Sequence, residues 1–176
     1  IIGEVTLKLT AIESAQMVVR QHAASNLEQL FKLLQDPTLD DRYSVAWIDS
    51  LATGVEMGRG VAMFGHHAAQ AELEARVGKQ YKAEKSGTGK PGSKLNMPVD
   101  LPGWALNNLS IGAFNSWYYR REGSKQEPFL SGYAPYFYPL DAIGQWNRLY
   151  GKRGFVQYQC VIPEATAYDG IASLLQ

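Results

Sequence analysis

Two strand-like segments that lie close together in the sequence constrain the fold most. Residues 42–50 (RYSVAWIDS) have the composition of a strand, and residues 58–65 (GRGVAMFG) follow as a second one. The connection TGVEM between them is compatible with a hairpin, whose two strands are antiparallel. Alternation along the first strand places four side chains on one face: Tyr43, Val45, Trp47 and Asp49. The sequence therefore favours an antiparallel sheet.

The clearest helix signal is the segment SNLEQLFKLLQDP at residues 25–37. Ser25 and Glu28 have the spacing of a capping box, and Pro37 follows the expected end. Apolar residues recur at helical spacing, at Leu27, Leu30, Phe31 and Leu34. This pattern predicts an amphipathic helix with one buried face.

Other segments complete the expected architecture. Alternation predicts strands over residues 2–9 and 154–163, and residues 15–19 are compatible with another. Helices are expected over 67–80, over 104–123 and after Pro163, whereas 82–103 has the Gly, Lys, Ser and Pro content of a flexible loop. We therefore predict an α+β fold, an antiparallel sheet with helices on one face.

Composition excludes several classes of function. The chain of 176 residues has 17 basic and 17 acidic residues, so no net field attracts nucleic acid or an anionic membrane. No apolar run approaches the roughly 18 residues of a membrane span. The single cysteine rules out an internal disulfide and agrees with a reducing, cytoplasmic location.

The stretch GFVQYQCVIP at 154–163 carries two candidate binding residues. In a strand, Gln157 and Gln159 project from the same face about 7 Å apart. Either loops supply hydrogen-bond partners for these amides or a hydroxyl-rich ligand does, and the local sequence leaves both open. Cys160 falls on the opposite face, where we expect a buried and inert thiol.

The remaining candidates are aromatic. Trp47 on a strand is more often a core residue, but an indole also forms the flat wall of a pocket. Adjacent histidines in a strand point apart, so His22, His66 and His67 do not indicate a metal site, and we expect none. The glycine-rich run GTGKPGS lacks the strand and helix that flank a phosphate-binding loop.

The run YFYPLDAIGQWNRLYGKRGFVQYQCVIP (136–163), together with segments 42–49, 58–65 and 116–123, resembles the substrate-binding, or cap, domain of FAD-linked oxidoreductases of the vanillyl-alcohol-oxidase superfamily. The resemblance implies that residues 1–10 are the last strand of a preceding FAD-binding domain. Residues 11–176 would then be the first part of the cap, whose free sheet face covers the flavin ring and the substrate.

The same resemblance implies roles for individual residues. Gln157 and Gln159 match positions that line the active site, Trp47 matches a pocket wall, and Phe137 stands where the family has a tyrosine. Ile2 matches a position that touches FAD, and no catalytic residue is expected in this chain.

The implied activity is oxidation of an alcohol of sugar, polyol or lactone type by hydride transfer to flavin. The expected partners are a small hydroxylated substrate and the FAD-binding domain of the same polypeptide. Two alternatives stay open at this point: a non-catalytic ligand-binding module and a protein-interaction module.

Overall fold

The computed structural model describes residues 3–39, 41–80, 95–96, 107–125, 127–138, 143–144 and 156–176. Its strands are β1 (Gln16–Ala24), β2 (Tyr43–Ile48), β3 (Gly60–His67), β4 (Leu95–Asn96), β5 (Phe129–Gly132) and β6 (Ile143–Gly144). Its α-helices are α1 (Leu27–Leu34), α2 (Gln70–Gln80), α3 (Asn108–Gly123), α4 (Tyr133–Phe137) and α5 (Ala167–Leu174). Short 3-10 turns span Gly54–Glu56 and Glu164–Thr166.

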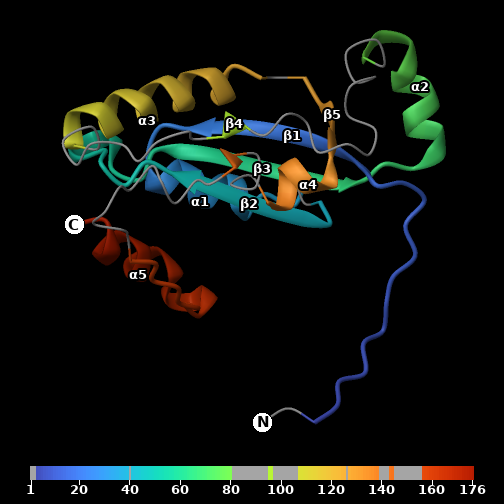
Figure 1. The fold of residues 1–176 in the computed structure, drawn as a ribbon. Coiled ribbons are helices and arrows are strands. Elements are labelled where there is room, and N and C mark those ends of the chain that lie inside the picture. The colour runs from blue at the N-terminus through green and yellow to red at the C-terminus, as the bar shows by residue number, and fades with distance from the viewer. Residues whose placement is uncertain are drawn as a thin grey trace.

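The described strands form an antiparallel sheet of four, in the order β2-β3-β1-β5, with β4 and β6 as a separate parallel pair (Figure 1). The expected hairpin is confirmed, since Tyr43 lies opposite Gly65 and Trp47 opposite Val61. Gly60 permits the close approach of the two strands, because a Cβ there would lie 2.2 Å from the carbonyl oxygen of Trp47. The α+β class is therefore confirmed.

One face of the sheet carries the closed core. Ala62 and Phe64 of β3 share this face with Ala24 of β1, and the buried side of α1 covers them with Leu27 and Leu30. Ile171 and Ala172 of α5, together with Leu175 directly after it, pack against the same cluster. Burial of these aliphatic and aromatic groups stabilises the described part of the fold.

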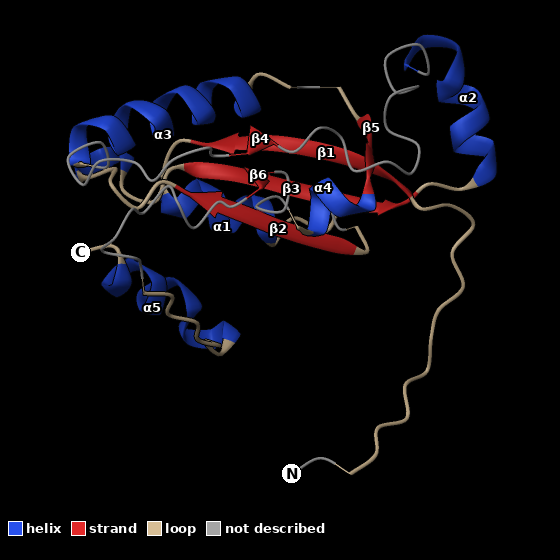
Figure 2. Cartoon of the chain, in the orientation of Figure 1, coloured by secondary structure: helices blue, strands red, loops and turns tan. Residues whose placement is uncertain are grey.

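The opposite face is covered by α3 and α4. Gly123 of α3 lies against Ala23 of β1, since a Cβ at Gly123 would lie 2.8 Å from the Ala23 Cβ. Tyr136 of α4 lies in the same way against Gly65 of β3. The helices thus occupy both faces of the sheet, with α1 and α3 on opposite sides (Figure 2), rather than the single face expected from the sequence.

Helix α1 begins one residue later than the capping-box spacing suggested. Asn26 is the N-cap, and its side chain accepts a hydrogen bond of 2.9 Å from the Gln29 amide. The Gln29 side chain in turn accepts a hydrogen bond of 2.6 Å from the Ser25 amide. Glu28 instead forms an exposed ion pair with Lys32 one turn later, at 2.6 Å. The predicted helix is confirmed, whereas its predicted cap is wrong.

Two predicted strands are absent from the described ranges. Residues 3–12 are extended but pair with no strand, and residues 156–163 are irregular. The fourth strand of the sheet is instead the short β5, which the sequence did not indicate. An alternating pattern shows which side chains would share a face of a strand. It does not provide the neighbouring strand that the backbone N–H and C=O groups need for hydrogen bonding, and no strand forms when that neighbour is missing.

Three further expectations can be compared with the structure. Cys160 is exposed rather than buried, because the strand that would have buried it is not formed. The loop expected over 82–103 lies outside the described residues except for Leu95 and Asn96 of β4. None of the helices in the described ranges combines the length and apolarity needed to cross a membrane.

Candidate functional site

The candidate site is built on the face of β2 that points away from α1. Tyr43, Val45 and Trp47 share this face, as alternation predicted, because they pair with Gly65, Met63 and Val61 of β3. Trp47 is partly buried, whereas Val45 between the two aromatic rings is 41% exposed. An aliphatic side chain left open between aromatic ones forms a shallow apolar floor.

Helix α3 provides one wall of this floor. The Tyr118 ring lies against the Trp47 indole, with centroids 4.8 Å apart. Phe114, one turn earlier, stacks on Tyr118 at 6.1 Å and is exposed. The Trp47 indole therefore lies between the sheet and α3, which is a suitable position for the wall of a pocket.

A buried polar network fixes α3 at that end of the sheet. Asp49, directly after β2, is 1% exposed and accepts hydrogen bonds from Arg59 Nε at 3.0 Å and from Arg59 Nη2 at 2.8 Å. Asn115 of α3 donates to the same carboxylate at 2.7 Å, and the Leu51 amide donates at 3.0 Å. The network joins β2, the start of β3 and the middle of α3.

The charge state of Asp49 follows from these contacts. Burial alone would raise the pKa of the carboxyl, but hydrogen bonds from Arg59, Asn115 and the Leu51 amide outweigh it, so the pKa lies below its usual value. The carboxylate therefore stays ionised at neutral pH and keeps Arg59 paired. The role of this network is to hold the wall of the site in place.

Helix α4 provides the opposite wall. The hydroxyl of Tyr136 donates a hydrogen bond of 3.0 Å to the carbonyl oxygen of Tyr43. Its ring lies directly over Gly65, where a Cβ would come within 3.1 Å of the ring carbons. Burial, with a smaller contribution from the Asp41 charge, raises the pKa of Tyr136 to about 12, so this hydroxyl stays a donor at neutral pH.

Phe137 extends from α4 over the start of β2. Its ring meets the Tyr43 ring edge-on at 5.0 Å and is 39% exposed. A cavity of about 310 Å³ opens here, lined by Arg42, Tyr43, Ser44, Val45, Tyr136 and Phe137. Because the lining includes side chains from both faces of β2, the cavity lies at the free edge of that strand.

The structure brings only part of the predicted site together. Trp47 and Phe137 stand at the two ends of the β2 face, one against α3 and the other on α4. Gln157 and Gln159 are exposed in an irregular segment, and no described contact joins them to either aromatic residue. Ile2 lies outside the described residues.

Two residues of this site were missed by sequence reasoning. Tyr118 lies in a predicted helix and Tyr136 opens the run 136–163 that carries the family resemblance, but neither was singled out as a site residue. The available signal was the density of aromatic residues in helices and turns, where sheet packing does not require them. Which of them would contact β2 depended on how the helices cross the sheet.

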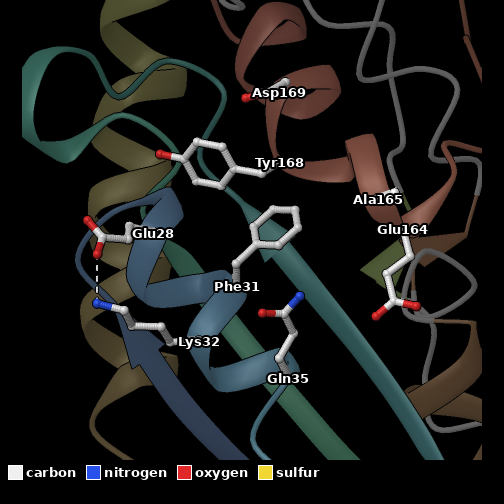
Figure 3. Close-up of a pocket in the computed structure, with 8 residues that line it drawn as sticks. All are labelled: Glu28, Phe31, Lys32, Gln35, Glu164, Ala165, Tyr168 and Asp169. Atoms are coloured by element: carbon white, nitrogen blue, oxygen red, sulfur yellow. Dashed lines mark hydrogen bonds and ion pairs between the residues drawn. The ribbon is translucent and has the colours of Figure 1, made fainter.

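A larger hollow of about 700 Å³ lies between α1 and α5 (Figure 3). Phe31 and Tyr168 meet edge-on at its centre, 5.4 Å apart. Its lining also includes three carboxylates, Glu28, Glu164 and Asp169, together with Lys32 and Gln35. It is widely open to solvent, and its lining includes none of the candidate site residues Trp47, Phe137, Gln157 and Gln159. We therefore place the candidate site on β2, where Trp47 and Phe137 lie.

The histidines are separated as predicted. His66 faces Asp41 and Glu72, with ring nitrogens 2.8 Å and 3.1 Å from their carboxylate oxygens. His67 points to the other side, where its Nδ1 is 3.0 Å from the Ser14 carbonyl oxygen. Within the ranges that the structure describes, no three His, Cys, Asp or Glu side chains converge as metal ligands.

Comparison with known proteins gives a distant relationship to an oxidase. No family model matches the chain. It is 26% identical over 167 residues to decaprenylphosphoryl-beta-D-ribose oxidase of Mycolicibacterium smegmatis, covering 93% of this chain and 34% of that protein. An uncharacterized protein in the mprA 5' region of Streptomyces coelicolor is 25% identical over 159 residues, covering 89% of this chain and 42% of the other. The chain spans less than half the length of these relatives.

Proposed function

We propose that this chain is the substrate-binding part of an FAD-dependent oxidoreductase that oxidises an alcohol by hydride transfer to flavin. The supporting observation is the similarity to a protein named as an oxidase, which extends over 93% of the chain. The proposed substrate carries hydroxyl groups and is of sugar, polyol or lactone type. The FAD-binding domain is proposed to belong to the same polypeptide, because the relative is about three times as long as the matched region.

The open β2 face fits a planar, partly apolar group. Val45 is exposed between Tyr43 and Trp47, so a ring laid on this face would contact an aliphatic floor between two aromatic walls. When bound, FAD would accept the hydride, and most of its binding groups would come from outside this chain. The residues of this chain would exclude water from the face and orient the substrate.

Gln157 and Gln159 are proposed to hydrogen-bond substrate hydroxyls. Both amides are exposed and carry no charge, so they donate and accept at a small desolvation cost. Trp47 and Phe137 are proposed as the walls that set the shape of the pocket. Phe137 has no hydroxyl, so it would select by shape and apolar contact rather than by hydrogen bonding.

The test is a substrate screen on the full-length protein. Under anaerobic conditions, a true alcohol substrate should bleach the flavin absorbance, and sugars, polyols and lactones should be compared at equal concentration. Replacing Trp47 by Ala should lower the bleaching rate while the flavin stays bound. A full-length protein that contains no flavin, or whose flavin no alcohol in the panel reduces, would exclude the proposed function.

A second test concerns the location of the cofactor. We expect the 176 residues alone to bind FAD weakly and to show no turnover, because the proposed flavin domain lies elsewhere in the polypeptide. Equilibrium dialysis with FAD measures this directly. A yellow preparation with stoichiometric flavin would contradict the proposed division of the protein.

One observation favours a second candidate function, a protein-interaction module. Helix α3 exposes three large apolar side chains, Leu109, Phe114 and Trp117. An exposed apolar patch of this kind is typical of a surface that another protein covers. A full-length protein with an FAD-binding domain directly upstream would decide in favour of the oxidoreductase.

A further inference from the structure

The side chain of Tyr118, on α3, combines a half-buried ring with an unused hydroxyl. Its ring lies 4.8 Å from the Trp47 indole between centroids and stacks on Phe114 at 6.1 Å. The hydroxyl makes no hydrogen bond with any residue that the structure describes. In the described ranges, the buried side-chain atoms without a hydrogen-bond partner belong to Gln16 and His22, so the Tyr118 hydroxyl is reached by solvent.

The Tyr118 side chain extends from α3 toward β2. Helix α3 packs on β1 and β3, whereas Trp47 belongs to β2 at the edge of the sheet. A ring that starts on α3 and lies against Trp47 therefore runs from above the middle of the sheet toward its edge strand. The hydroxyl is the atom of this side chain farthest from α3, so it lies on the side of β2.

The backbone that carries Tyr118 is fixed by polar contacts on the preceding turn. Asn115 donates a hydrogen bond of 2.7 Å to the buried carboxylate of Asp49. The next residue, Ser116, accepts a hydrogen bond of 2.9 Å at Oγ from Arg59 Nη2. A hydroxyl on a ring and a backbone that are both held in place loses little conformational freedom when it binds a ligand.

The protonation state of Tyr118 suits a hydrogen-bond donor. Burial raises the pKa of its hydroxyl, and the negative charge of Glu122 adds to this, while Arg121 opposes it. The hydroxyl therefore keeps its proton at neutral pH and above. A neutral phenol both donates and accepts, and it brings no charge that a ligand would have to desolvate.

The other end of the β2 face offers less for hydrogen bonding. Phe137 has no hydroxyl, and the hydroxyl of Tyr136 already donates to the carbonyl oxygen of Tyr43 at 3.0 Å. The open hydroxyl of Tyr118 thus stands at the end of the face where Trp47 lies. A ligand on this face would meet apolar groups below it and a donor beside Trp47.

We infer that Tyr118 is a substrate-binding residue whose hydroxyl donates a hydrogen bond to an oxygen of a cyclic substrate that lies on Val45 and Trp47. The inference rests on the proposed function and narrows its substrate class. A sugar ring or a lactone has a flat C–H face for the indole and oxygens at its rim, whereas an open-chain polyol has no fixed flat face.

The first test is Tyr118→Phe in the full-length protein, because this change keeps the ring and removes the hydroxyl. In anaerobic flavin bleaching, the half-saturating substrate concentration should rise about three- to tenfold, the value of one lost neutral hydrogen bond. The limiting rate and the amount of bound flavin should not change, because the lost contact holds substrate and transition state alike.

The matched control is Tyr119→Phe, one residue further along α3. The Tyr119 ring lies under the Arg59 guanidinium, 5.4 Å from its central carbon, and the substitution leaves that ring in place. Bleaching by this variant should equal that of the unaltered protein. If Tyr118→Phe also matched it, the inference would be overturned while the proposed function stood.

The second test varies the substrate. Analogues that each lack one oxygen are compared in the unaltered protein and in Tyr118→Phe. The analogue without the bound oxygen should lose affinity for the unaltered protein but not for Tyr118→Phe, because the partner is already missing there. Equal losses in both proteins for every analogue, or open-chain polyols that bind as well as cyclic compounds, would overturn the inference.

Two further results separate binding from structure and from the proposed function. Tyr118→Phe should leave the urea midpoint and the tryptophan fluorescence unchanged, whereas Tyr118→Leu, which removes the ring beside Trp47, should shift both. A shift with Tyr118→Phe would make the hydroxyl a structural contact and overturn the inference. An unaltered full-length protein whose flavin no alcohol bleaches would exclude the proposed function and this inference together.

Discussion

The two faces of the same sheet differ in how completely the chain covers them. On one face, Phe64 and Ala62 are closed by Leu27 and Leu30 of α1 into a cluster with almost no solvent contact. On the other, Val45 is open between the walls formed by α3 and α4. Val61 and Val19 lie on the same face as Val45 but are buried, so both faces contribute to stability and only the β2 part of the second face has the side chains and space for binding.

Local sequence explains the difference. The closed face is matched by an amphipathic helix with small and aliphatic residues at its buried positions. On the other face, the β2 part is contacted only through Tyr118 at one end and through Tyr136 at the other among the described residues. Substitutions on the two faces should therefore affect different properties.

The largest expected effect comes from matched phenylalanines. Phe64→Ala should lower the free energy of unfolding by about 3–5 kcal/mol, because it leaves a cavity in the closed core. Phe137→Ala, on the open face, should cost only about 1 kcal/mol, because its ring is already partly in water. Urea denaturation of both variants measures the contrast. Equal losses would mean that the two faces are equally closed.

Next in size is the buried network that holds α3. Asp49→Asn should destabilise by about 3 kcal/mol, because it leaves the Arg59 guanidinium largely buried without its charged partner. Glu28→Gln, which removes one partner of the exposed pair with Lys32, is the control and should leave the stability almost unchanged. Thermal denaturation measures both variants. A larger loss of stability in Glu28→Gln than in Asp49→Asn would mean that the Asp49 network does not hold α3 against the sheet.

Acid should reveal the same network. The pKa of Asp49 is lowered in the folded chain, so the carboxylate contributes stability above its unfolded pKa of 3.8 and loses it as pH falls through the lower folded pKa. The difference in stability between the native chain and Asp49→Asn should therefore shrink below pH 4. Denaturation midpoints from pH 7 to pH 2 test this, and a constant difference would contradict it.

A smaller effect is expected where α4 is seated. Gly65→Ala places a Cβ within 3.1 Å of the Tyr136 ring, so it should displace α4 at a cost of about 1–3 kcal/mol. Tyr136→Phe removes one hydrogen bond and should cost about 1 kcal/mol. Urea denaturation measures both losses, and an Ala as well tolerated at Gly65 as at the open position Gly112 would contradict this packing.

Alkaline pH gives an independent reading of Tyr136. Because its folded pKa is raised to about 12, the folded state holds this proton when the unfolded state has lost it, and stability should fall as pH rises from 10 to 12. Tyr136→Phe should show a shallower fall over the same range. Parallel curves for the two proteins would mean that burial does not raise the pKa of Tyr136.

The smallest effect on stability is expected at the glutamines. Gln157→Ala and Gln159→Ala change exposed side chains and should alter the free energy of unfolding by less than about 0.5 kcal/mol. In the full-length protein they should slow flavin bleaching by substrate while the amount of bound FAD stays the same. Unchanged bleaching would remove both residues from the site and leave the β2 face as the binding surface by itself.

The sequence by itself determined the elements whose signals are short-range. Helix α1 follows from apolar spacing and a nearby cap, and the β2–β3 hairpin follows from two β-rich segments joined by a short connection. The shared face of Tyr43, Val45 and Trp47 follows from the same alternation. Each of these depends on residues within about one helix or one hairpin.

Only the tertiary structure decided which segments became strands and where the aromatic walls stand. Residues 3–9 and 156–162 alternate, yet neither is paired in the described structure, whereas the short FLSG segment of β5 pairs with β1 more than a hundred residues away. Tyr118 and Tyr136 reach the β2 face because Asn115 and Tyr136 itself bind partners that are distant in sequence. A segment becomes a strand only when a second segment pairs with its backbone groups, and an aromatic residue becomes a wall only when its helix is held against the sheet. Which segments meet depends on the packing of the whole chain, so a local sequence pattern does not specify it.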